Sequence, residues 1–521
     1  MKRNSIKNAI LFTIILALTA ALAGCGSGNS GTGAASTGSP SPSSGAGGAS
    51  GSPESSLPPY ELTMAFFTLG SQTAGIPEVE AAVSKIAKEK LNTTVKFLPI
   101  AYGSWSQQMN LMLAGNEELD LMISGVSGNY ATQVAQGQIL PMNELLDKYG
   151  TNIKDTLYPF ILDAVKVNGE TYGVPARRDF AGGRSLYMRK DIVDKYNIDL
   201  SKYTKFEDLT ELFQIVKDKE PNMIPLVSFA PGSTPVDSMA ATLFDVLVNK
   251  MGTIKVDGGE SKIVNMYETP EYEGLVKLVR GWYEKGFIRK DEATAKDTAQ
   301  DLIKAGQAFA YFSTWKPGNE AQDSRKAGAE LVSISVGKPL TDSSHGTRFN
   351  WSIAKNSKDP ARAMMFLDLM FADPEINNLL SWGIEDRDYV KKSETTIGYP
   401  ANLDASSVPY GLNTGWLFGD QFKSFIFETD QADLWEQMDK FNLDSTKSPA
   451  VGFNYDASSV KNEVAAVTNV LNQYRVGLET GTLDPASTLP EFISKLRDAG
   501  IDDIVADKQK QFDAWKQAKS Q

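Results

Sequence analysis

The chain has 521 residues, of which 41% are hydrophobic and 22% charged, and its formal net charge is -12. This length is enough for two or more domains, and the composition is that of a globular protein. An acidic chain is repelled by phosphate backbones, so we expect no nucleic-acid partner. The single Cys, Cys25, and the single His, His345, exclude an internal disulfide bond and a zinc site built from several histidines. We therefore predict no metal and no cofactor, and we expect His345 to be solvated in a polar loop.

The amino terminus has the pattern of a secretory signal. Residues 1–8 are basic and polar, and residues 9–23 are almost wholly apolar, which is shorter than the roughly 20 residues of a membrane span. Cys25 directly follows Leu-Ala-Gly, which resembles the bacterial lipobox. The resemblance implies cleavage before Cys25 and acylation of its thiol. The alternative is an ordinary signal peptide with a chance Cys.

The following segment, residues 26–59, is rich in Gly, Ser, Ala, Thr and Pro, and its only charge is Glu54. Such a composition cannot bury enough apolar surface to offset the entropy of ordering. We predict a flexible tether with a root-mean-square reach on the order of 30 Å.

From residue 60 onward, strand and helix patterns alternate. Strands are predicted at 61–68, 94–100 and 119–124, with helices between them, which is the order of a parallel sheet covered by helices. Ligands of such sheets bind beyond the carboxyl ends of the strands. This places Ser124, Asn129 and Tyr130 at a candidate site.

A second α/β stretch follows, and apolar residues at helical spacing predict helices at the carboxyl end. Strands are expected at 186–189, 224–229, 308–313 and 349–354, and helices at 206–217, 271–285 and 359–371. The carboxyl-terminal helices could extend a lobe, close the cleft floor or set permease specificity, and the sequence leaves these three roles open.

Several segments resemble those of family 1 extracellular solute-binding proteins, whose best-known member binds maltose. The resemblance rests on residues 102–121, 137–146, 168–175 and 304–315. The tail, with Gly-Phe-Asn-Tyr-Asp at 452–456 and Leu-Arg-Asp-Ala-Gly-Ile at 496–501, is similar to a carboxyl-terminal domain of uncharacterised function. That domain occurs on a lipoprotein subgroup of the family, usually from Gram-positive bacteria and associated with sugar transport.

The resemblance implies an α/β fold with two lobes of the periplasmic-binding-protein type II, hinges at 174–179 and 337–350, and extra carboxyl-terminal helices. It implies a monomer on the outer face of the cytoplasmic membrane that delivers a carbohydrate to an ABC permease. The expected parts are a signal peptide at 1–24, lipidated Cys and tether at 25–59, lobe 1 at 60–175, mainly lobe 2 at 176–335, a return to lobe 1 at 336–425, and a helical extension at 426–521.

Sugars offer C–H faces to aromatic rings and hydroxyl groups to polar side chains. Trp315 matches the stacking position of the family, and further aromatic candidates near element ends are Trp105, Tyr130, Trp351, Trp382 and Trp416. Each Trp could instead be a packing residue.

Four charged candidates follow the first expected hinge: Arg177, Arg178, Asp179 and Arg184. An Arg fork suits vicinal hydroxyls and suits a uronate carboxylate better. This motivates the hypothesis that the carbohydrate is an acidic oligosaccharide.

Two other functions stay open. The chain contains 64 Asp and Glu residues, so a carboxylate pair for a membrane-anchored polysaccharide-degrading enzyme is not excluded by counting, although no local signature marks one. A binder of another solute such as a peptide, or a sensor that signals to a membrane kinase, is the second rival. No phosphate-binding Gly-x-x-x-x-Gly-Lys loop occurs, so no nucleotide site is expected. We predict a binding protein and not an enzyme.

Overall fold

The computed structural model describes residues 57–519, except 71, 116, 257–260 and 413. The predicted signal, Cys25 and nearly all of the predicted tether therefore lie outside the described residues. Within the described part, no helix has both the length and the apolar character that crossing a membrane requires.

The first lobe is built on a five-stranded mixed sheet with the order β2-β1-β3-β15-β6. Its strands are β1 (Tyr60–Thr68), β2 (Thr93–Ala101), β3 (Leu121–Ser124), β6 (Val174–Pro175) and β15 (Asn350–Ile353). β1 is parallel to β2 and β3, whereas β15 runs antiparallel to β3 and β6. Residues 62–67 are all buried, as expected for a strand covered on both faces. The carboxyl ends of β1 to β3 and the amino end of β15 share one edge of the sheet.

Helices from two separate stretches of sequence complete this lobe. They are α1 (Ile76–Leu91), α2 (Trp105–Ala114), α13 (Pro360–Ala372) and α14 (Pro374–Trp382). Shorter elements connect β3 to β6: α3 (Tyr130–Ala135), α4 (Asn143–Tyr149), α5 (Thr151–Thr156), α6 (Pro159–Ala164), β4 (Lys166–Val167) and β5 (Glu170–Thr171). One hydrophobic cluster joins buried residues within 62–180 to others within 351–418.

The second lobe contains a four-stranded sheet with the order β13-β7-β12-β8. Its strands are β7 (Gly183–Arg189), β8 (Ile224–Val227), β12 (Ala308–Trp315) and β13 (Leu331–Ser335). A smaller sheet holds β9 (Phe244–Asp245), β10 (Thr253–Lys255) and β11 (Ile263–Val264). The helices are α7 (Lys190–Lys195), α8 (Leu209–Lys219), α9 (Pro235–Ala240), α10 (Pro270–Glu284), α11 (Ala299–Lys304) and α12 (Asn319–Ala327).

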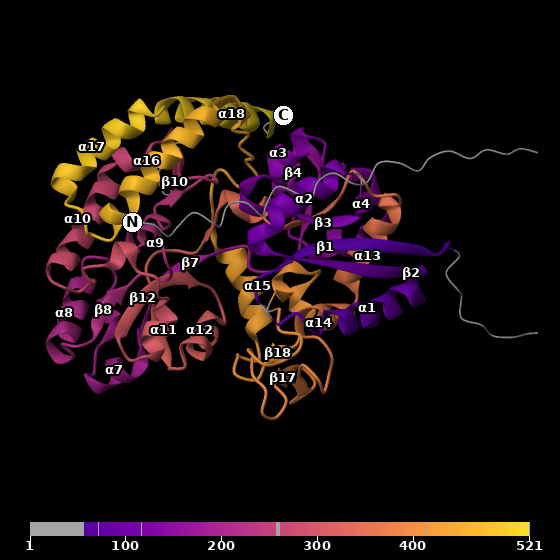
Figure 1. Ribbon diagram of the computed structural model, residues 1–521, viewed down its shortest axis with the longest axis horizontal. Helices are drawn as coiled ribbons and strands as arrows, with labels where there is room; N and C mark the ends of the chain where they lie inside the picture. The colour runs from indigo at the N-terminus through magenta and orange to yellow at the C-terminus, as the bar shows by residue number, and fades with distance from the viewer. Residues whose placement is uncertain (1–56, 71, 116, 257–260, 413, 520–521) are drawn as a thin grey trace, which may run out of the picture. The chain divides into compact units, whose positions relative to one another are not determined.

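Three carboxyl-terminal helices pack on the second lobe. They are α16 (Lys461–Glu479), α17 (Pro485–Asp498) and α18 (Ile501–Lys519), and α16 and α17 lie beside α10 (Figure 1). Their buried side chains, such as Leu478 and Phe512, belong to the same hydrophobic cluster as Leu186 and Phe312 of the second sheet. Of the three roles left open by the sequence, the structure supports extension of a lobe.

Three segments cross between the lobes. The first runs from β6 to β7, and the second runs from β13 through β14 (Leu340–Thr341) to β15. The third contains α15 (Leu434–Asp444) and β19 (Thr446–Lys447). The backbones of Gly182 and Leu340 exchange two hydrogen bonds of 3.0 Å, and β14 pairs in parallel with β19. The predicted two-lobe α/β fold with a hinge and extra helices is confirmed, and the third crossing was not predicted.

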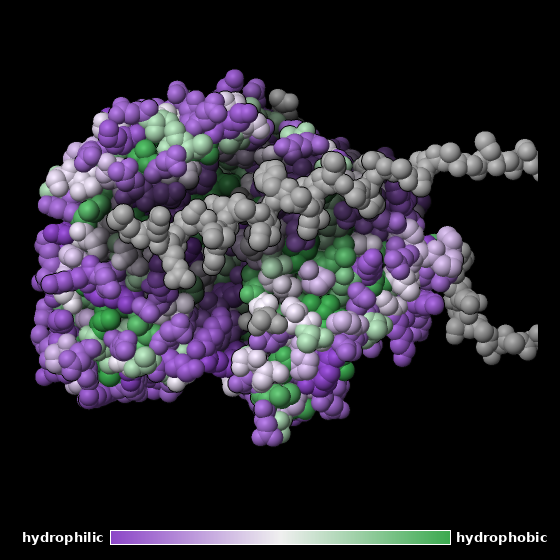
Figure 2. All heavy atoms as spheres, in the orientation of Figure 1, coloured by the Kyte–Doolittle hydropathy of each residue, from purple (hydrophilic) through white to green (hydrophobic). Residues whose placement is uncertain are grey.

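A small separate sheet lies at the outer end of α14. It contains β16 (Val390–Lys391), β17 (Thr396–Gly398) and β18 (Ile426–Phe427), and it has its own hydrophobic cluster. Most large apolar side chains are thus gathered into cores, and the face seen in Figure 2 is largely hydrophilic, with hydrophobic residues in small patches.

Candidate functional site

A cavity of about 210 Å³, here called the cleft pocket, is lined by the first two crossing segments and by the second lobe. Its charged and titratable lining residues are Arg178, Asp179, Arg184, Asp342, His345 and Arg348. Ligand pockets usually measure roughly 300–1,000 Å³. An oligosaccharide would therefore extend beyond this cavity, or the lobes would move apart to admit it.

Two arginines are buried in the cleft pocket with few partners. The Arg178 side chain is 12% exposed, its nearest carboxylate oxygen, on Asp179, is 3.8 Å away, and its Nε has no hydrogen-bond partner among the described residues. Arg184 donates to the Thr314 hydroxyl over 3.2 Å and to the Gly183 carbonyl over 3.0 Å. Burial lowers the pKa of both guanidinium groups. A buried cation of this kind is stabilised by an anion that enters the pocket.

Two carboxylates also line the cleft pocket. Burial pushes the pKa of Asp179 upward, but Lys316, whose ammonium lies 3.3 Å away, and Arg178 bring that pKa below its usual value. Asp342 is half-buried, and the ring of His345, at 2.9 Å, together with Ser344 holds the pKa of Asp342 below its usual value. Both carboxylates are thus ionised acceptors at neutral pH.

An aromatic wall lies next to the arginines at the strand-end edge of the first lobe. Phe67, fully buried at the end of β1, contacts the rings of Tyr102, Phe349 and Trp416 with centroid distances of 5.2, 5.5 and 6.1 Å. The guanidinium of Arg178 lies 5.3 Å from the Trp416 ring and 5.9 Å from the Phe349 ring. Phe349 has φ 59°, a conformation that a bulky residue rarely adopts and that is often found at binding sites.

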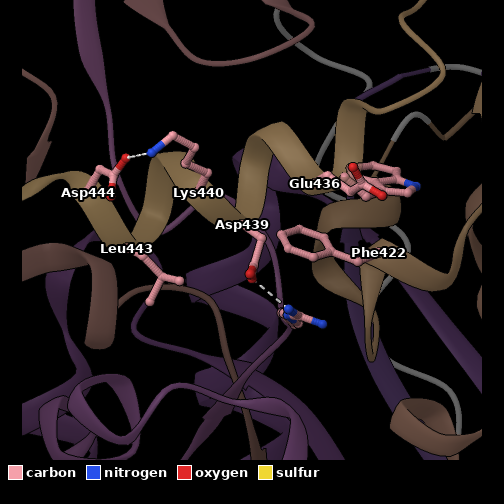
Figure 3. A pocket seen from close by; sticks show the side chains of 8 residues that line it. Phe422, Glu436, Asp439, Lys440, Leu443 and Asp444 are labelled. Atoms are coloured by element: carbon pink, nitrogen blue, oxygen red, sulfur yellow. Dashed lines mark hydrogen bonds and ion pairs between the residues drawn. The ribbon is translucent and has the colours of Figure 1, made fainter.

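A second, larger cavity of about 570 Å³ lies along α15 (Figure 3). Arg177 lines it and donates from Nη2 to Asp439 over 2.6 Å, while its guanidinium sits 4.3 Å from the Phe422 ring. Trp435 stacks on Phe422 with a centroid distance of 5.4 Å. The consecutive residues Arg177 and Arg178 therefore line two different cavities, and the ion pair of Arg177 is already made within the chain.

The family model for bacterial extracellular solute-binding proteins matches residues 71–375, which is more than half of the chain. The chain belongs to this family. A second model, described as a domain of unknown function (DUF3502), matches residues 449–517 of this solute-binding protein.

The relatives of this solute-binding protein include transporter components. A carbohydrate ABC transporter substrate-binding protein of Streptococcus pneumoniae serotype 4 is 27% identical over 467 residues, which cover 86% of this chain and 90% of the relative. The crystal structure of an N-glycan transport solute binding protein from Streptococcus pneumoniae has a TM-score of 0.77 and 26% identity, covering 87% of this chain and 98% of that one. The structure of that protein in complex with Man1GlcNAc has a TM-score of 0.69, 25% identity and coverages of 87% and 99%.

Four predicted ligand residues of this solute-binding protein lie inside the first core. Trp105, Ser124, Tyr130 and Trp351 are 2%, 0%, 1% and 0% exposed. The Tyr130 hydroxyl donates to the Val165 carbonyl over 2.7 Å, and Trp351 Nε1 donates to the Leu417 carbonyl over 2.6 Å. In this conformation these side chains offer no surface to a ligand.

The remaining aromatic candidates are distributed over different surroundings. Trp315 is half-buried against Phe441 of α15, with ring centroids 5.2 Å apart. Trp382 lines a third cavity of about 270 Å³, which does not include the arginines. Trp416 belongs to the aromatic wall. Asn129 is half-buried in the loop after β3.

Three residues that line the cleft pocket were not identified from the sequence, and the expectation for a fourth residue, His345, was wrong. Arg348, Phe349 and Asp342 lie in the second crossing, which the sequence marked only as a hinge. Charged and aromatic residues in that hinge could have been weighted like those of the first hinge. The expectation that His345 is solvated was wrong, because its side chain is 16% exposed and its Nδ1 lies 2.9 Å from Asp342 Oδ1.

Proposed function

We propose that this solute-binding protein captures a carbohydrate outside the cytoplasm and delivers it to an ABC importer. The proposal is carried by the cleft pocket, where buried arginines lie beside an aromatic wall between two lobes. Rings serve the C–H faces of sugars, and guanidinium groups serve their oxygens. The carbohydrate transport relatives, among them one named for N-glycan transport, support the same ligand class.

The ligand that fits this pocket best is an oligosaccharide with a carboxylate group. The chain as a whole has a net charge of -12, yet Arg178, Arg184 and Arg348 line one small cavity that holds only two carboxylates. A uronate carboxylate would offset the cost of burying Arg178 through charge-assisted hydrogen bonds. We expect Arg178, Arg184 and Trp416 to contact it, with Trp315 nearer the rim.

Binding would work as a clamp. A ligand that touches both Arg184 of the second lobe and Trp416 of the first lobe stabilises the closed arrangement over the open one by its differential affinity. The closed form would then dock on the permease, while a separate subunit hydrolyses ATP.

The anchor belongs to the same proposal. A diacylglyceryl group on Cys25 would hold the protein on the outer face of the membrane, since two acyl chains suffice for stable attachment. The expected result of Cys25→Ala is release of the protein from the membrane fraction into the medium. Unchanged membrane retention of this variant would contradict lipidation.

Calorimetric titration with matched neutral and uronate-containing oligosaccharides tests the ligand. We expect the uronate oligomers to bind more tightly, with an affinity that falls as salt rises, because the contacts are charged. Binding of neutral sugars alone would overturn the acidic ligand, and binding of neither would overturn the carbohydrate.

The rival functions make different predictions. A polysaccharide-degrading enzyme would release shorter products from the same oligosaccharides at high protein concentration, and we expect none. A sensor would co-purify with a membrane kinase, whereas we expect co-purification with permease subunits.

A further inference from the structure

The loop formed by residues 246–252, here called the edge loop, has an unusual backbone. Leu247, Val248 and Lys250 have φ of 45°, 83° and 60°, although none of them is glycine. A β-branched residue such as Val248 is strained in this region. Strain of this kind persists only where the surroundings fix the loop.

The edge loop meets both the cleft pocket and the first lobe. Val246 lines the cleft pocket. Val248 packs directly on Gly128, in the loop that follows β3 of the first lobe, so closely that a side chain at Gly128 would collide with it. Asp245, just before the loop, accepts 2.8 Å hydrogen bonds from the N–H and the hydroxyl of Ser343 in the second crossing. The edge loop is thus one place where the second lobe touches the first beside the pocket, and the ion pair between Lys519 of α18 and Asp163 of α6 is another contact between them.

Helix α18 holds the edge loop through one buried ammonium group. Lys508 has no exposed surface, and its Nζ donates to the Leu247 carbonyl over 3.2 Å, to Asn249 Oδ1 over 2.9 Å and to the Gly252 carbonyl over 3.0 Å. An ammonium group has three donors, and here all three are used on a single loop. Gly252 also packs against the Val505 side chain of the same helix.

Helix α16 also contacts the edge loop, indirectly, through Asp237 of α9. Arg475 donates to Asp237 over 2.7 Å and to the buried Glu479 over 2.9 Å, and Asp237 in turn forms an ion pair with Lys250 of the loop. Two helices of the carboxyl-terminal domain therefore reach the same seven-residue loop through separate polar contacts.

We infer that the carboxyl-terminal helices α16 and α18 position the edge loop, and through it set the contact that closes the second lobe on the first. Lys508 is the main positioning residue. The inference gives the domain matched at residues 449–517 a role in this chain, and it rests on the proposed clamp only for its effect on ligand binding.

Hydrogen exchange on the full-length protein without ligand, below pH 7 where Lys508 keeps its proton and all three donors, tests the inference. Lys508→Met keeps the length and burial of the side chain but removes its donors. We expect the amides of Lys250 and Met251 to exchange about tenfold faster, the change for roughly one lost charge-assisted bond. The matched control is Arg497→Met, which breaks the 2.8 Å ion pair between α17 and Glu268, away from the edge loop. Unchanged exchange in Lys508→Met, or an equal rise in the control, would overturn the inference.

A distance measurement separates positioning from general stability. Spin labels on the exposed residues Leu111, of the first lobe, and Lys277, of the second, report the spacing of the lobes in a Cys25→Ala background. Lys508→Met and Val248→Gly should each broaden the distance distribution, and the double variant should broaden it no further, because both act on one contact. If the broadening in the double variant equalled the sum of the two single effects, Lys508 would not act through the contact between Val248 and Gly128. No sugar is needed, so failure here is distinct from failure of the proposed ligand.

Discussion

The aromatic wall beside the cleft pocket and the edge loop that borders the pocket are positioned by different forces. On the first lobe, Tyr102, Phe349 and Trp416 rest on the buried ring of Phe67, so packing sets their places. On the second lobe, hydrogen bonds and ion pairs from distant helices hold the edge loop. Packing resists any loss of volume, whereas a polar tether fails when one partner atom is removed. The aromatic wall should therefore act as a rigid platform, and the edge loop as the adjustable element.

The largest expected effect is on the aromatic wall. Phe67→Ala should lower the free energy of unfolding by about 3–5 kcal/mol and should also weaken ligand binding, because three wall residues lose their support. The control is Phe66→Ala, since Phe66 is equally buried but contacts Phe97 and Phe418 instead. Urea unfolding and titration of the folded protein would measure both quantities. Equal loss of affinity in the two variants would contradict the platform.

The next effect concerns charge in the pocket. Arg178→Met should weaken binding of a uronate oligosaccharide by about 10- to 100-fold, as expected for one charge-assisted hydrogen-bonded pair. Arg177→Met is the matched control, because Arg177 is the adjacent residue and faces Asp439 in the other cavity. If Arg177→Met were the more damaging change, the ligand would belong in the cavity along α15.

A smaller effect is expected in the pH dependence of stability, and it concerns the second lobe, where polar contacts hold the edge loop. Burial lowers the pKa of Lys508 to about 7, and the other titratable groups facing it are Asp245 and Tyr455. Since the unfolded chain then binds more protons than the folded one above pH 7, stability should rise by about 1 kcal/mol between pH 7 and 8. Lys508→Met should lose this increment in urea unfolding at the two pH values. An identical pH dependence in the variant would contradict it.

The smallest effect is expected at the exposed face of α15. Lys440 is 77% exposed, and its one ion pair within the described part of the chain is with Asp444, four residues along. Lys440→Ser should change stability by less than about 0.5 kcal/mol and leave ligand affinity unchanged. A clear loss of ligand affinity would instead indicate that the ligand binds in the cavity along α15.

Much of the fold could be predicted because its signals are local. The mainly apolar run at 62–67, interrupted only by Thr63, and the helical stripes gave most strands and long helices to within a few residues. The third crossing gave no such signal, since β19 has two residues and pairs with β14 more than 100 residues earlier.

The candidate site was only partly predictable. Trp105 and Trp416 both lie near element ends, but one is buried under the wall and the other forms its surface. Local sequence does not distinguish them, because the difference depends on rings brought together from residues 67, 349 and 416. The conformation of the edge loop is even harder to predict from the local sequence, because it depends on Lys508, about 260 positions later.

The three crossings also constrain the order in which the two lobes can fold while the chain appears, amino terminus first. The first core needs residues up to Phe418, and the second needs residues up to Phe512. The first core can form before the carboxyl-terminal helices have appeared, whereas the second core cannot, and these long sequence separations slow the folding of both lobes. The second lobe, which needs almost the last residue, therefore takes its final shape only after nearly the whole chain has appeared.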